Sequence, residues 1–345
     1  MPQTIAVIMP FFQREPGILT RALESIRRQL IPDGWFVDVI VVDDSSPCSA
    51  DDESQNLTFD RPLHLRVVRQ ENGGVAAARN RGLEEADQST TLIAFLDSDD
   101  IWPVNHLARA IRATEQGFDF YFTDNCREGH HESHCRSPFV AETAAFLDAS
   151  PQKTGFLEVP KDYMMGLTLR EFPSQASTVV YRRSINQGLR FATELKSSGE
   201  DVLFFTCLVA SVNRVCFDLD SMVECGKGVN IYFSNLGWNS ERCLSIKVDV
   251  LLAHRMIAET LNLSSRNKQW NDVRLVECRR ELAFHMLRNL RKAPLRALRE
   301  INRLARGAPG AAIVLPMDMI GVMFSVVLRN YKNKKHDEPQ EALKA

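Results

Sequence analysis

Short apolar runs rich in valine and isoleucine alternate with stretches of helical periodicity along the amino-terminal part of the chain. Such alternation is typical of proteins in which helices cover a largely parallel sheet. We therefore predict an α/β fold with a mostly parallel, twisted sheet flanked by helices. The predicted strands are 5–9, 37–42, 64–69 and 91–96, and the predicted helices among them are 17–30 and 75–86.

The remainder of the chain becomes mainly helical, and its charge changes. Residues 1–265 carry 25 basic and 36 acidic side chains, whereas 266–306 carry 12 basic and 4 acidic ones. A shift of this kind marks a boundary near residue 265. We predict a helical carboxyl-terminal extension over 246–335 and a polar tail over 336–345. Further predictions are strands at 118–123 and 176–181, a helix at 200–212, a loop at 220–245, and helices at 248–262, 272–292 and 295–306.

Composition excludes several classes of protein. The 345 residues include 42 Lys and Arg against 44 Asp and Glu, so no overall basic excess is present to attract nucleic acid. The 8 cysteines are scattered and form no CxxC pair, which indicates reduced thiols. The first residues lack the basic segment and the cleavage site of a secretory signal peptide. We expect a cytoplasmic protein.

Acidic residues terminate two of the predicted strands. Asp43 and Asp44 follow the second strand, and Asp97, Asp99 and Asp100 follow the fourth. In an open α/β sheet the ligand lies beyond the carboxyl ends of the strands, so both groups should face one crevice. Crowded carboxylates repel one another unless a cation holds them, and oxygen ligands suit Mg²⁺ or Mn²⁺. The alternative is that Asp97 and Asp100 cap a helix that starts near residue 103.

A glycine pair lies between the two acidic groups. Gly73 and Gly74 precede the predicted helix 75–86, and Arg79 lies one turn into that helix. Glycines let the backbone approach a ligand, and a helix amino end together with arginine suits a diphosphate. An ordinary loop-to-helix turn is the alternative for the glycine pair alone.

Four segments, taken in their order, resemble those of glycosyltransferase family two. The resemblance extends over about residues 4–215 and implies a GT-A fold, with a donor half at about 1–125 and an acceptor half at about 126–245, together forming a catalytic domain over 1–245. Phe12 to Leu19 is similar to the corresponding segment of bacterial exopolysaccharide glucosyltransferases of the succinoglycan type. The four segments are Val7 to Arg14, Val42 to Ser46, Asn72 to Asn80, and Asp97 to Asp100.

The resemblance also implies roles at the nucleotide end of the donor site. Asp44 would bind uracil, and Pro10 and Phe12 would contact the base and ribose. Phe12 stands where the family often has tyrosine, so a hydroxyl contact would be lost while ring packing remains.

At the phosphate end, the resemblance places Arg79 near the donor pocket and Asp97 on the ribose or sugar. Ser98 joins this donor-binding group. Asp99 would bind the metal that bridges the diphosphate, with Asp100 as a supporting residue.

Ser198 to Leu203 resembles the Glu-Asp pair that the family places at the start of a later helix. By this resemblance Asp201 is the general base and Glu200 supports it. Inverting sugar transfer needs a base that takes the proton of the acceptor hydroxyl as that oxygen attacks the anomeric carbon. The alternative is that both acids merely favour a helix amino end.

The segment Cys126 to Cys135 combines two cysteines with three histidines. Three hypotheses stay open for it: a structural zinc site, an acceptor-facing loop in which His130 and His131 contact the acceptor, and an incidental polar loop.

The carboxyl-terminal helices are basic and amphipathic, with leucines at helical spacing over 287–304. Such a surface suggests contact with anionic lipid, and a solvated helix packed on the catalytic domain is the alternative. Residues 311–328 are apolar except for Asp318 and are interrupted by Pro316. These two residues favour an interfacial or core helix over a membrane span.

These observations lead to one predicted function. We expect an inverting glycosyltransferase, dependent on Mn²⁺ or Mg²⁺, that moves one sugar from a UDP-sugar to an acceptor hydroxyl. UDP-glucose is the expected donor, and a lipid-linked oligosaccharide at the cytoplasmic face of the inner membrane is the expected acceptor. A catalytically silent nucleotide-binding or scaffolding protein is the alternative. A nicotinamide dehydrogenase is excluded because no GxGxxG follows the first strand.

Overall fold

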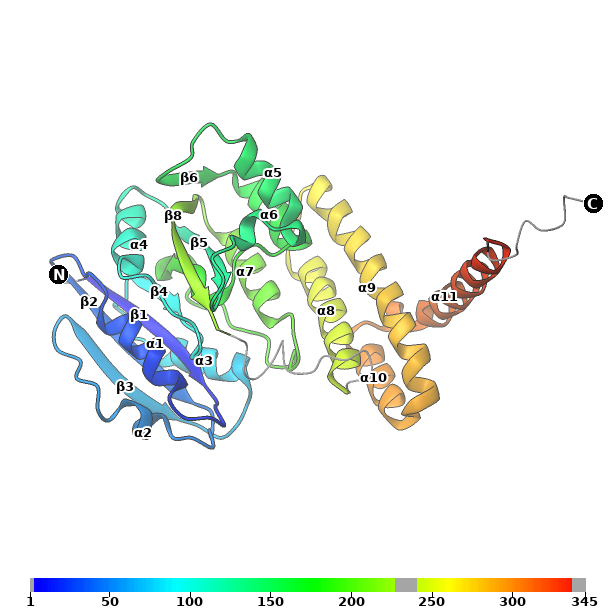
Figure 1. The fold of residues 1–345 in the computed structure, drawn as a ribbon, viewed down its shortest axis with the longest axis horizontal. Coiled ribbons are helices and arrows are strands. Elements are labelled where there is room, and N and C mark those ends of the chain that lie inside the picture. Colours follow the sequence, from blue (N-terminus) through cyan, green and yellow to red (C-terminus); the bar gives the residue numbers. More distant parts are fainter. Residues whose placement is uncertain (1–2, 227–240, 337–345) are drawn as a thin grey trace, which may run out of the picture.

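The computed structural model of the chain describes residues 3–226 and 241–336. One eight-stranded sheet runs through the body in the order β3-β2-β1-β4-β7-β5-β8-β6 (Figure 1). Its strands are β1 (Gln3–Phe11), β2 (Trp35–Asp43), β3 (Leu63–Arg69), β4 (Leu92–Phe95), β5 (Phe120–Arg127), β6 (Phe156–Val159), β7 (Val179–Arg182) and β8 (Val215–Cys225).

The sheet is parallel in its amino-terminal part and mixed beyond it. β1 pairs with β2 on one side and with β4 on the other, both in parallel. The carboxyl ends of these parallel strands lie at one edge of the sheet, which is where ligands bind in open α/β sheets. β7 is antiparallel to β4 and β5, and β6 is antiparallel to β8. The predicted α/β class with a mostly parallel sheet is confirmed.

Alternate residues of the strands serve two separate cores. Ile5 and Val7 of β1 pack with the helices α1 and α4, whereas Ala6 and Ile8 face α3 and the later helices. Gly82 allows α3 to lie directly on β1, since a Cβ there would be only 2.3 Å from Ile8 Cγ2. The helices of this part are α1 (Ile18–Arg27), α2 (Ala50–Ser54), α3 (Val75–Glu85), α4 (His106–Glu115), α5 (Ala141–Ala149), α6 (Lys161–Arg170) and α7 (Glu200–Ser211).

The predicted loop at 220–245 is wrong at its start, because β8 continues to Cys225 in parallel with β5. Asp218 and Asp220 interrupt the apolar pattern that would have indicated this strand. The Asp218 carboxylate is nevertheless buried, because Arg109 donates to it at 2.6 Å and the Tyr121 hydroxyl at 2.7 Å. A partner distant in sequence thus makes an aspartate compatible with a strand interior.

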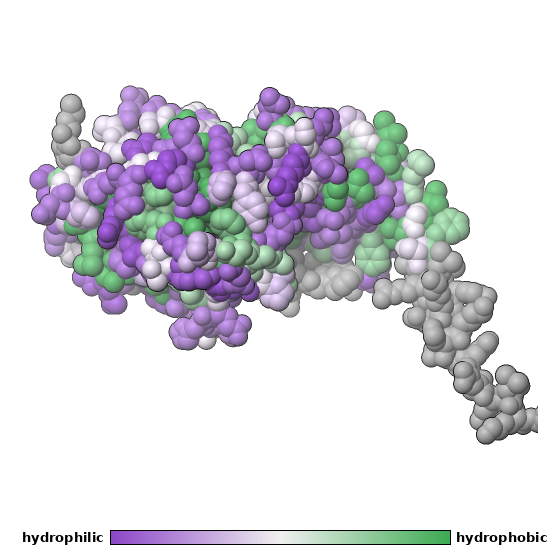
Figure 2. Space-filling view, turned by 90° about the horizontal axis from the view of Figure 1, so that it is seen from above, coloured by the Kyte–Doolittle hydropathy of each residue, from purple (hydrophilic) through white to green (hydrophobic). Residues whose placement is uncertain are grey.

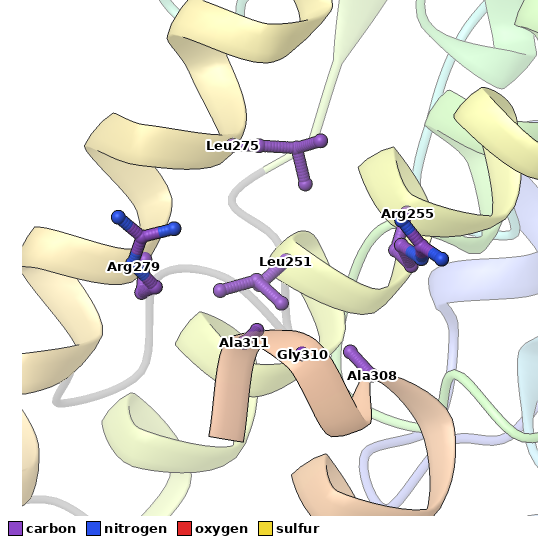
Figure 3. A pocket seen from close by; sticks show the side chains of 7 residues that line it. All are labelled: Leu251, Arg255, Leu275, Arg279, Ala308, Gly310 and Ala311. Atoms are coloured by element: carbon purple, nitrogen blue, oxygen red, sulfur yellow. The ribbon is translucent and has the colours of Figure 1, made fainter. Parts of the chain in front are cut away.

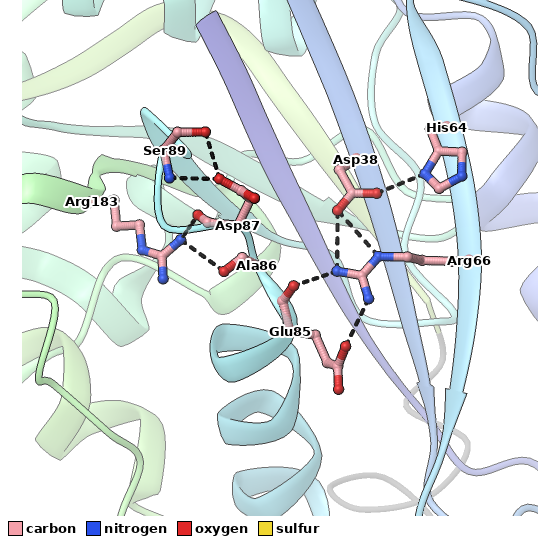
Figure 4. Close-up of polar contacts among 8 residues, drawn as sticks. All are labelled: Asp38, His64, Arg66, Glu85, Ala86, Asp87, Ser89 and Arg183. Atoms are coloured by element: carbon pink, nitrogen blue, oxygen red, sulfur yellow. Dashed lines mark hydrogen bonds and ion pairs between the residues drawn. The ribbon is translucent and has the colours of Figure 1, made fainter.

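The polar network around Arg66 joins the edge of the sheet to α3 (Figure 4). Arg66 donates to Asp38 of β2 at 3.2 Å and to Glu85 at the end of α3 at 2.9 Å. This network is remote from the crevice and is partly exposed.

Four more helices follow within residues 241–336: α8 and α9 pack on α7 and α6 of the body, whereas α10 and α11 pack on these helices and on each other (Figure 1). Trp270 lies over Gly166 of α6, where a Cβ would be only 2.1 Å from its ring. The guanidinium of Arg170, at the end of α6, lies 3.8 Å from a centroid of the Trp270 ring system, so a cation–π contact joins α6 to α9. Arg266, on α9 itself, lies 4.4 Å from a centroid of the same ring system. These helices are α8 (Glu241–Thr260), α9 (Ser265–Lys292), α10 (Pro294–Gly307) and α11 (Pro309–His336).

Candidate active site

A cleft of about 840 Å³ opens at the carboxyl ends of the parallel strands. It receives side chains from the loops after β1, β2 and β4, from α3, and from the start of α7. The structure therefore brings together segments that lie far apart in the sequence, from Pro10 to Arg274. The predicted site residues that line the cleft are Pro10, Phe12, Asp44, Arg79, Asp97, Ser98, Asp99, Asp100, Glu200 and Asp201.

The two aspartates after β2 have different surroundings. The Asp43 carboxylate accepts from the amides of Ser46 at 2.7 Å and Ala50 at 3.0 Å, and thereby shapes the local loop. The Asp44 carboxylate accepts from the amides of Gly73 and Gly74, each at 2.8 Å.

Asp44 thus holds the glycine turn at the amino end of α3. Gln70 Nε2 donates a third bond, at 2.7 Å, to the Asp44 Oδ1 atom that Gly73 also contacts. Gly74 has φ +86°, a left-handed value that favours glycine. Because a carboxylate offers about four acceptor positions, Asp44 keeps capacity for one further N–H donor in the cleft.

Asp97 and Asp100 do not cap the following helix, so that alternative is wrong. The N-cap of α4 is Asn105. Asp97 accepts from Arg79 at 2.8 Å, and Asp100 accepts from the Gly226 amide, also at 2.8 Å. Both carboxylates are engaged within the site instead.

Negative charge is concentrated after β4. Burial, together with the charges of Asp97 and Asp99, raises the pKa of Asp100 to about 8. Ser98 is buried and accepts from Gln13 Nε2 at 3.0 Å, which links the loop after β4 to the loop after β1. Asp99 is partly exposed in the cleft.

Arg79 is buried between the two halves of the cleft. One terminal nitrogen, Nη2, donates to Asp97 at 2.8 Å, and the other, Nη1, donates to Glu200 at 3.1 Å. The guanidinium also lies 5.3 Å from the centroid of the Phe191 ring. Burial opposes the charged state of Arg79, but Asp97 and Glu200 outweigh burial and raise its pKa. Arg79 therefore joins the donor-side loop to the start of α7.

Glu200 and Asp201 occupy the first turn of α7. Burial raises the pKa of both carboxyl groups, and Arg79 acts in the opposite direction on each. Asp201 Oδ1 accepts from the Val202 amide at 2.8 Å. Both side chains also line the cleft.

Comparison with known proteins identifies the family. Residues 6–141 match the family model described as glycosyl transferase family 2. The chain is 34% identical over 235 residues to the succinoglycan biosynthesis protein ExoW of Rhizobium meliloti strain 1021, which covers 67% of this chain and 71% of ExoW. The chain belongs to glycosyltransferase family 2. It is a glycosyltransferase, and the resemblance found in its sequence is confirmed.

Solved structures confirm the GT-A fold of this glycosyltransferase. Staphylococcus aureus TarS 1–349 in complex with UDP-GlcNAc matches with a TM-score of 0.58 at 18% identity, over 92% of this chain and 89% of that one. The mannosyltransferase PcManGT from Pyrobaculum calidifontis, in complex with GDP-Man and Mn²⁺, matches with a TM-score of 0.50 at 15% identity, over 92% and 86% of the two chains.

His130 and His131 lie outside the cleft of the glycosyltransferase, contrary to their prediction as acceptor-side residues. Both are exposed in the loop after β5. The physical reason is that Asp124 of β5 accepts from the Cys135 amide at 2.9 Å and from the Ser133 hydroxyl, which folds the segment back on its own strand.

The zinc hypothesis for the same segment is not supported. Cys135 is buried with its thiol 3.8 Å from the carbonyl of Pro173, and burial raises its pKa. In residues 3–226 and 241–336, no group of three or more His, Cys, Asp or Glu side chains is placed to hold a metal ion.

The far wall of the cleft was not predicted from the sequence. Val250 and His254 of α8 and Arg274 of α9 line it, as does Lys196 before α7. These residues belong to helices whose apolar periodicity shows only that one face is buried. On the donor side, Gln13 also lines the cleft and was not singled out, although it lies inside the first family segment.

Proposed function

We propose that this glycosyltransferase moves one sugar from a UDP-sugar, with UDP-glucose as the expected donor, to an acceptor hydroxyl with inversion at the anomeric carbon. The observation that carries the proposal is the gathering of Asp44, the acids after β4 and Asp201 around one cleft. The relationship to ExoW, a succinoglycan biosynthesis protein, supports an exopolysaccharide product, and the UDP-GlcNAc complex of TarS supports a UDP-linked donor.

In this proposal Asp44 and Pro10 bind the uracil end of the donor. Asp44 is held rigidly by the glycine amides, and its remaining acceptor position suits the N–H of a pyrimidine ring. Phe12 lines the same end, and the Arg14 guanidinium lies 5.3 Å from its ring centroid. A flat aromatic surface there suits a base or ribose.

Asp201 is the proposed general base. Burial raises its pKa above the ordinary aspartate value, and a higher pKa makes the carboxylate a better proton acceptor near neutral pH. The Val202 amide fixes one carboxylate oxygen, which orients the other for the acceptor hydroxyl. Arg79 stabilises the ionised form of Asp201 and holds Glu200 beside it.

The residues after β4 fit a divalent metal. Asp97 and Asp99 are partly exposed oxygen donors in the cleft, and their charges add to the effect of burial in raising the pKa of neighbouring Asp100. Asp99, with Asp97 beside it, would hold Mn²⁺ or Mg²⁺, whose other ligands would include donor phosphate oxygens. Such an ion would neutralise charge on the departing diphosphate. The Mn²⁺ complex of PcManGT supports this choice.

We further propose that the acceptor is lipid-linked and that the protein contacts the cytoplasmic face of the inner membrane through α10 and α11. No helix of the described residues is long and apolar enough to cross a bilayer. α11 extends beyond the body (Figure 1) and exposes apolar side chains, as the green surface beside the grey C-terminal residues shows in Figure 2. These side chains are Ile313, Met317, Ile320, Met323 and Phe324.

The orientation of α11 supports surface contact. Asp318 pairs with Arg279 of α9, so the charge that interrupts the apolar segment faces protein. Figure 3 shows Arg279 beside the small cavity, of about 230 Å³, where α8 and α9 meet the start of α11. The exposed residues 313, 317, 320 and 324 recur at helical spacing and form one stripe. Exposed Leu295 and Leu298 and four arginines of α10 add the basic amphipathic character that favours anionic lipid.

The test is transfer from a panel of radiolabelled UDP-sugars by the purified protein, with Mn²⁺ and a lipid extract of the producing cells. We expect label in the lipid fraction with UDP-glucose and none when EDTA replaces Mn²⁺. Transfer that is equal with EDTA would reject the metal, and binding of UDP without transfer from any sugar of the panel would reject the enzymatic proposal.

A further inference from the structure

The wall of the cleft beyond the proposed base is formed by α8 and α9. Val250 and His254 lie four residues apart on α8, so they share one face of that helix, and both line the cleft. His254 is only 4% exposed, although it lines the cleft.

This wall lies directly against the start of α7. A Cβ on Gly199 would be 3.1 Å from the Ala253 Cβ and 3.6 Å from the Val250 Cα. Gly199 is the N-cap of α7, two residues before Asp201. The close packing places the face of α8 that carries His254 next to the turn that carries the proposed base.

Hydrogen bonds of Asn271 fix the state of the His254 ring. Asn271 Nδ2 donates to the carbonyl oxygen of His254 at 3.0 Å, which sets the orientation of the amide because a carbonyl only accepts. Asn271 Oδ1 then faces His254 Nδ1 at 2.9 Å, so Nδ1 carries the hydrogen. Burial lowers the pKa of His254 to about 4, with a further contribution from Arg274. The ring is neutral, and Nε2 keeps a lone pair.

We propose that His254 Nε2 accepts a hydrogen bond from a hydroxyl of the saccharide acceptor, so that α8 and α9 form the acceptor subsite of the cleft. The proposal rests on the function proposed above, because it needs an acceptor hydroxyl near Asp201. Donor-side residues come from the loops after β1, β2 and β4, which leaves the opposite wall for the second substrate.

A purely structural role would also explain part of the geometry. The pair of bonds between His254 and Asn271 joins α8 to α9, and a buried polar pair of this kind stabilises helix packing. That role uses Nδ1 and the backbone carbonyl but not Nε2. Variants that retain a polar atom near the position of Nδ1 but not of Nε2, or the reverse, therefore separate the structural role from the acceptor role.

His254→Asn retains an N–H donor near the position of Nδ1 and loses Nε2. We expect this variant to keep the thermal stability and the UDP affinity of the wild type. The amount of lipid extract needed for half-maximal transfer should rise about tenfold, which is the usual effect of one lost hydrogen bond. His254→Gln places an amide oxygen near the position of Nε2, and we expect half-saturation within about threefold of the wild type but lower stability, since the Asn271 bond is lost.

His285→Asn is the matched control. His285 lies on α9, is similarly buried and does not line the cleft. We expect it to leave half-saturation unchanged. If His254→Asn and the control saturate at the same amount of extract, the acceptor role is refuted. Wild-type protein that transfers no sugar at all would instead refute the function on which the inference rests.

A spectroscopic measurement keeps the inference testable if His254→Asn does not fold. Long-range ¹H–¹⁵N correlation spectra of histidine-labelled wild-type protein should assign His254 as the neutral Nδ1–H form at pH 7. Addition of the lipid extract should shift its Nε2 resonance, and not that of His285. An Nε2–H form, or an Nε2 resonance that does not respond to the extract, would overturn the proposal.

Discussion

Replacement of Arg79 by methionine removes the cation that joins the two halves of the cleft. Arg79 is 4% exposed and contacts Asp97 at 2.8 Å and Glu200 at 3.1 Å. Methionine fills a similar apolar volume but leaves two carboxylates without their partner. The change therefore tests whether charge, and not packing, is what Arg79 supplies.

The size of the expected loss of stability follows from how deeply Arg79 and its two carboxylate partners are buried. Removal of one partner of a buried ion pair costs about 3–5 kcal/mol, because the other charge stays buried without compensation. Asp97 is more than a third exposed, so water compensates it, and Glu200 carries most of the loss. We expect a decrease of about 3 kcal/mol in the free energy of unfolding at pH 8.5.

The loss of stability caused by Arg79→Met should depend on pH in a defined direction. Burial and Asp201 already raise the pKa of Glu200 to about 8, above the value of 4.5 in an unfolded chain. An acid with a raised pKa binds a proton on folding, so its contribution to stability falls as pH rises through that window. Without Arg79 the pKa of Glu200 rises further, and protonation at pH 6 relieves the unpaired charge. The loss should therefore be smaller at pH 6 than at pH 8.5.

Urea unfolding followed by tryptophan fluorescence, at both pH values, measures these quantities. The double variant Arg79→Met and Glu200→Gln removes both charges, and we expect a coupling energy of about 1–3 kcal/mol between the two positions. Arg66→Met is the matched control. Arg66 also bridges two carboxylates (Figure 4), but its side chain is 28% exposed, so its loss should be about 1 kcal/mol. Equal losses for Arg79→Met at both pH values, or purely additive losses in the double variant, would refute the electrostatic reasoning.

Three further predictions test the proposed chemistry and the membrane contact. Asp201→Asn should lower transfer by about 10² to 10⁴ while stabilisation by UDP with Mn²⁺ is unchanged, and normal turnover would remove Asp201 from the mechanism. Asp99→Ala should abolish Mn²⁺-dependent thermal stabilisation by UDP, and an unchanged shift would exclude Asp99 as the metal ligand. The double variant Ile313→Ser and Ile320→Ser should weaken co-sedimentation with phosphatidylglycerol vesicles at least about tenfold, since each isoleucine buried in the bilayer contributes about 1.5–3 kcal/mol. Leu30→Ser is the control: Leu30 is also exposed but lies outside α11, so its replacement should not weaken co-sedimentation. Equal binding of the double variant and the wild type would exclude α11 as the contact.

The donor half was largely predictable from the sequence because its signals are local. The strands β1, β2 and β4 are mostly apolar, and each acidic group follows its strand directly in the chain. The carboxyl ends of neighbouring parallel strands lie at one edge of the sheet, so sequence order alone places Asp44 and Asp97 near one crevice.

The acceptor half was less predictable because its stabilising contacts are distant in sequence. Asp218 lies inside β8 only because Arg109, from α4, neutralises it there. His130 and His131 were expected in the cleft because of their chemical type, but the hydrogen bonds that the Asp124 carboxylate accepts from Cys135 and Ser133 determine where the loop runs. Neither the contact of Arg109 with Asp218 nor that of Asp124 with its loop produces a periodic pattern in the sequence.

The helices beyond residue 241 show why a change in charge along a chain does not by itself locate a functional boundary. Their basic face suggested a separate surface, yet α8 and α9 also supply one wall of the cleft. Gly199 suits this arrangement, because its φ of +87° favours glycine and a Cβ there would lie only 3.1 Å from the Ala253 Cβ. The same helix bundle thus packs through α8 against Gly199, beside the turn that carries the proposed base, and continues through α10 into the exposed stripe of α11. A lipid-linked acceptor would require this geometry, since its sugar must reach the cleft while its lipid remains in the bilayer.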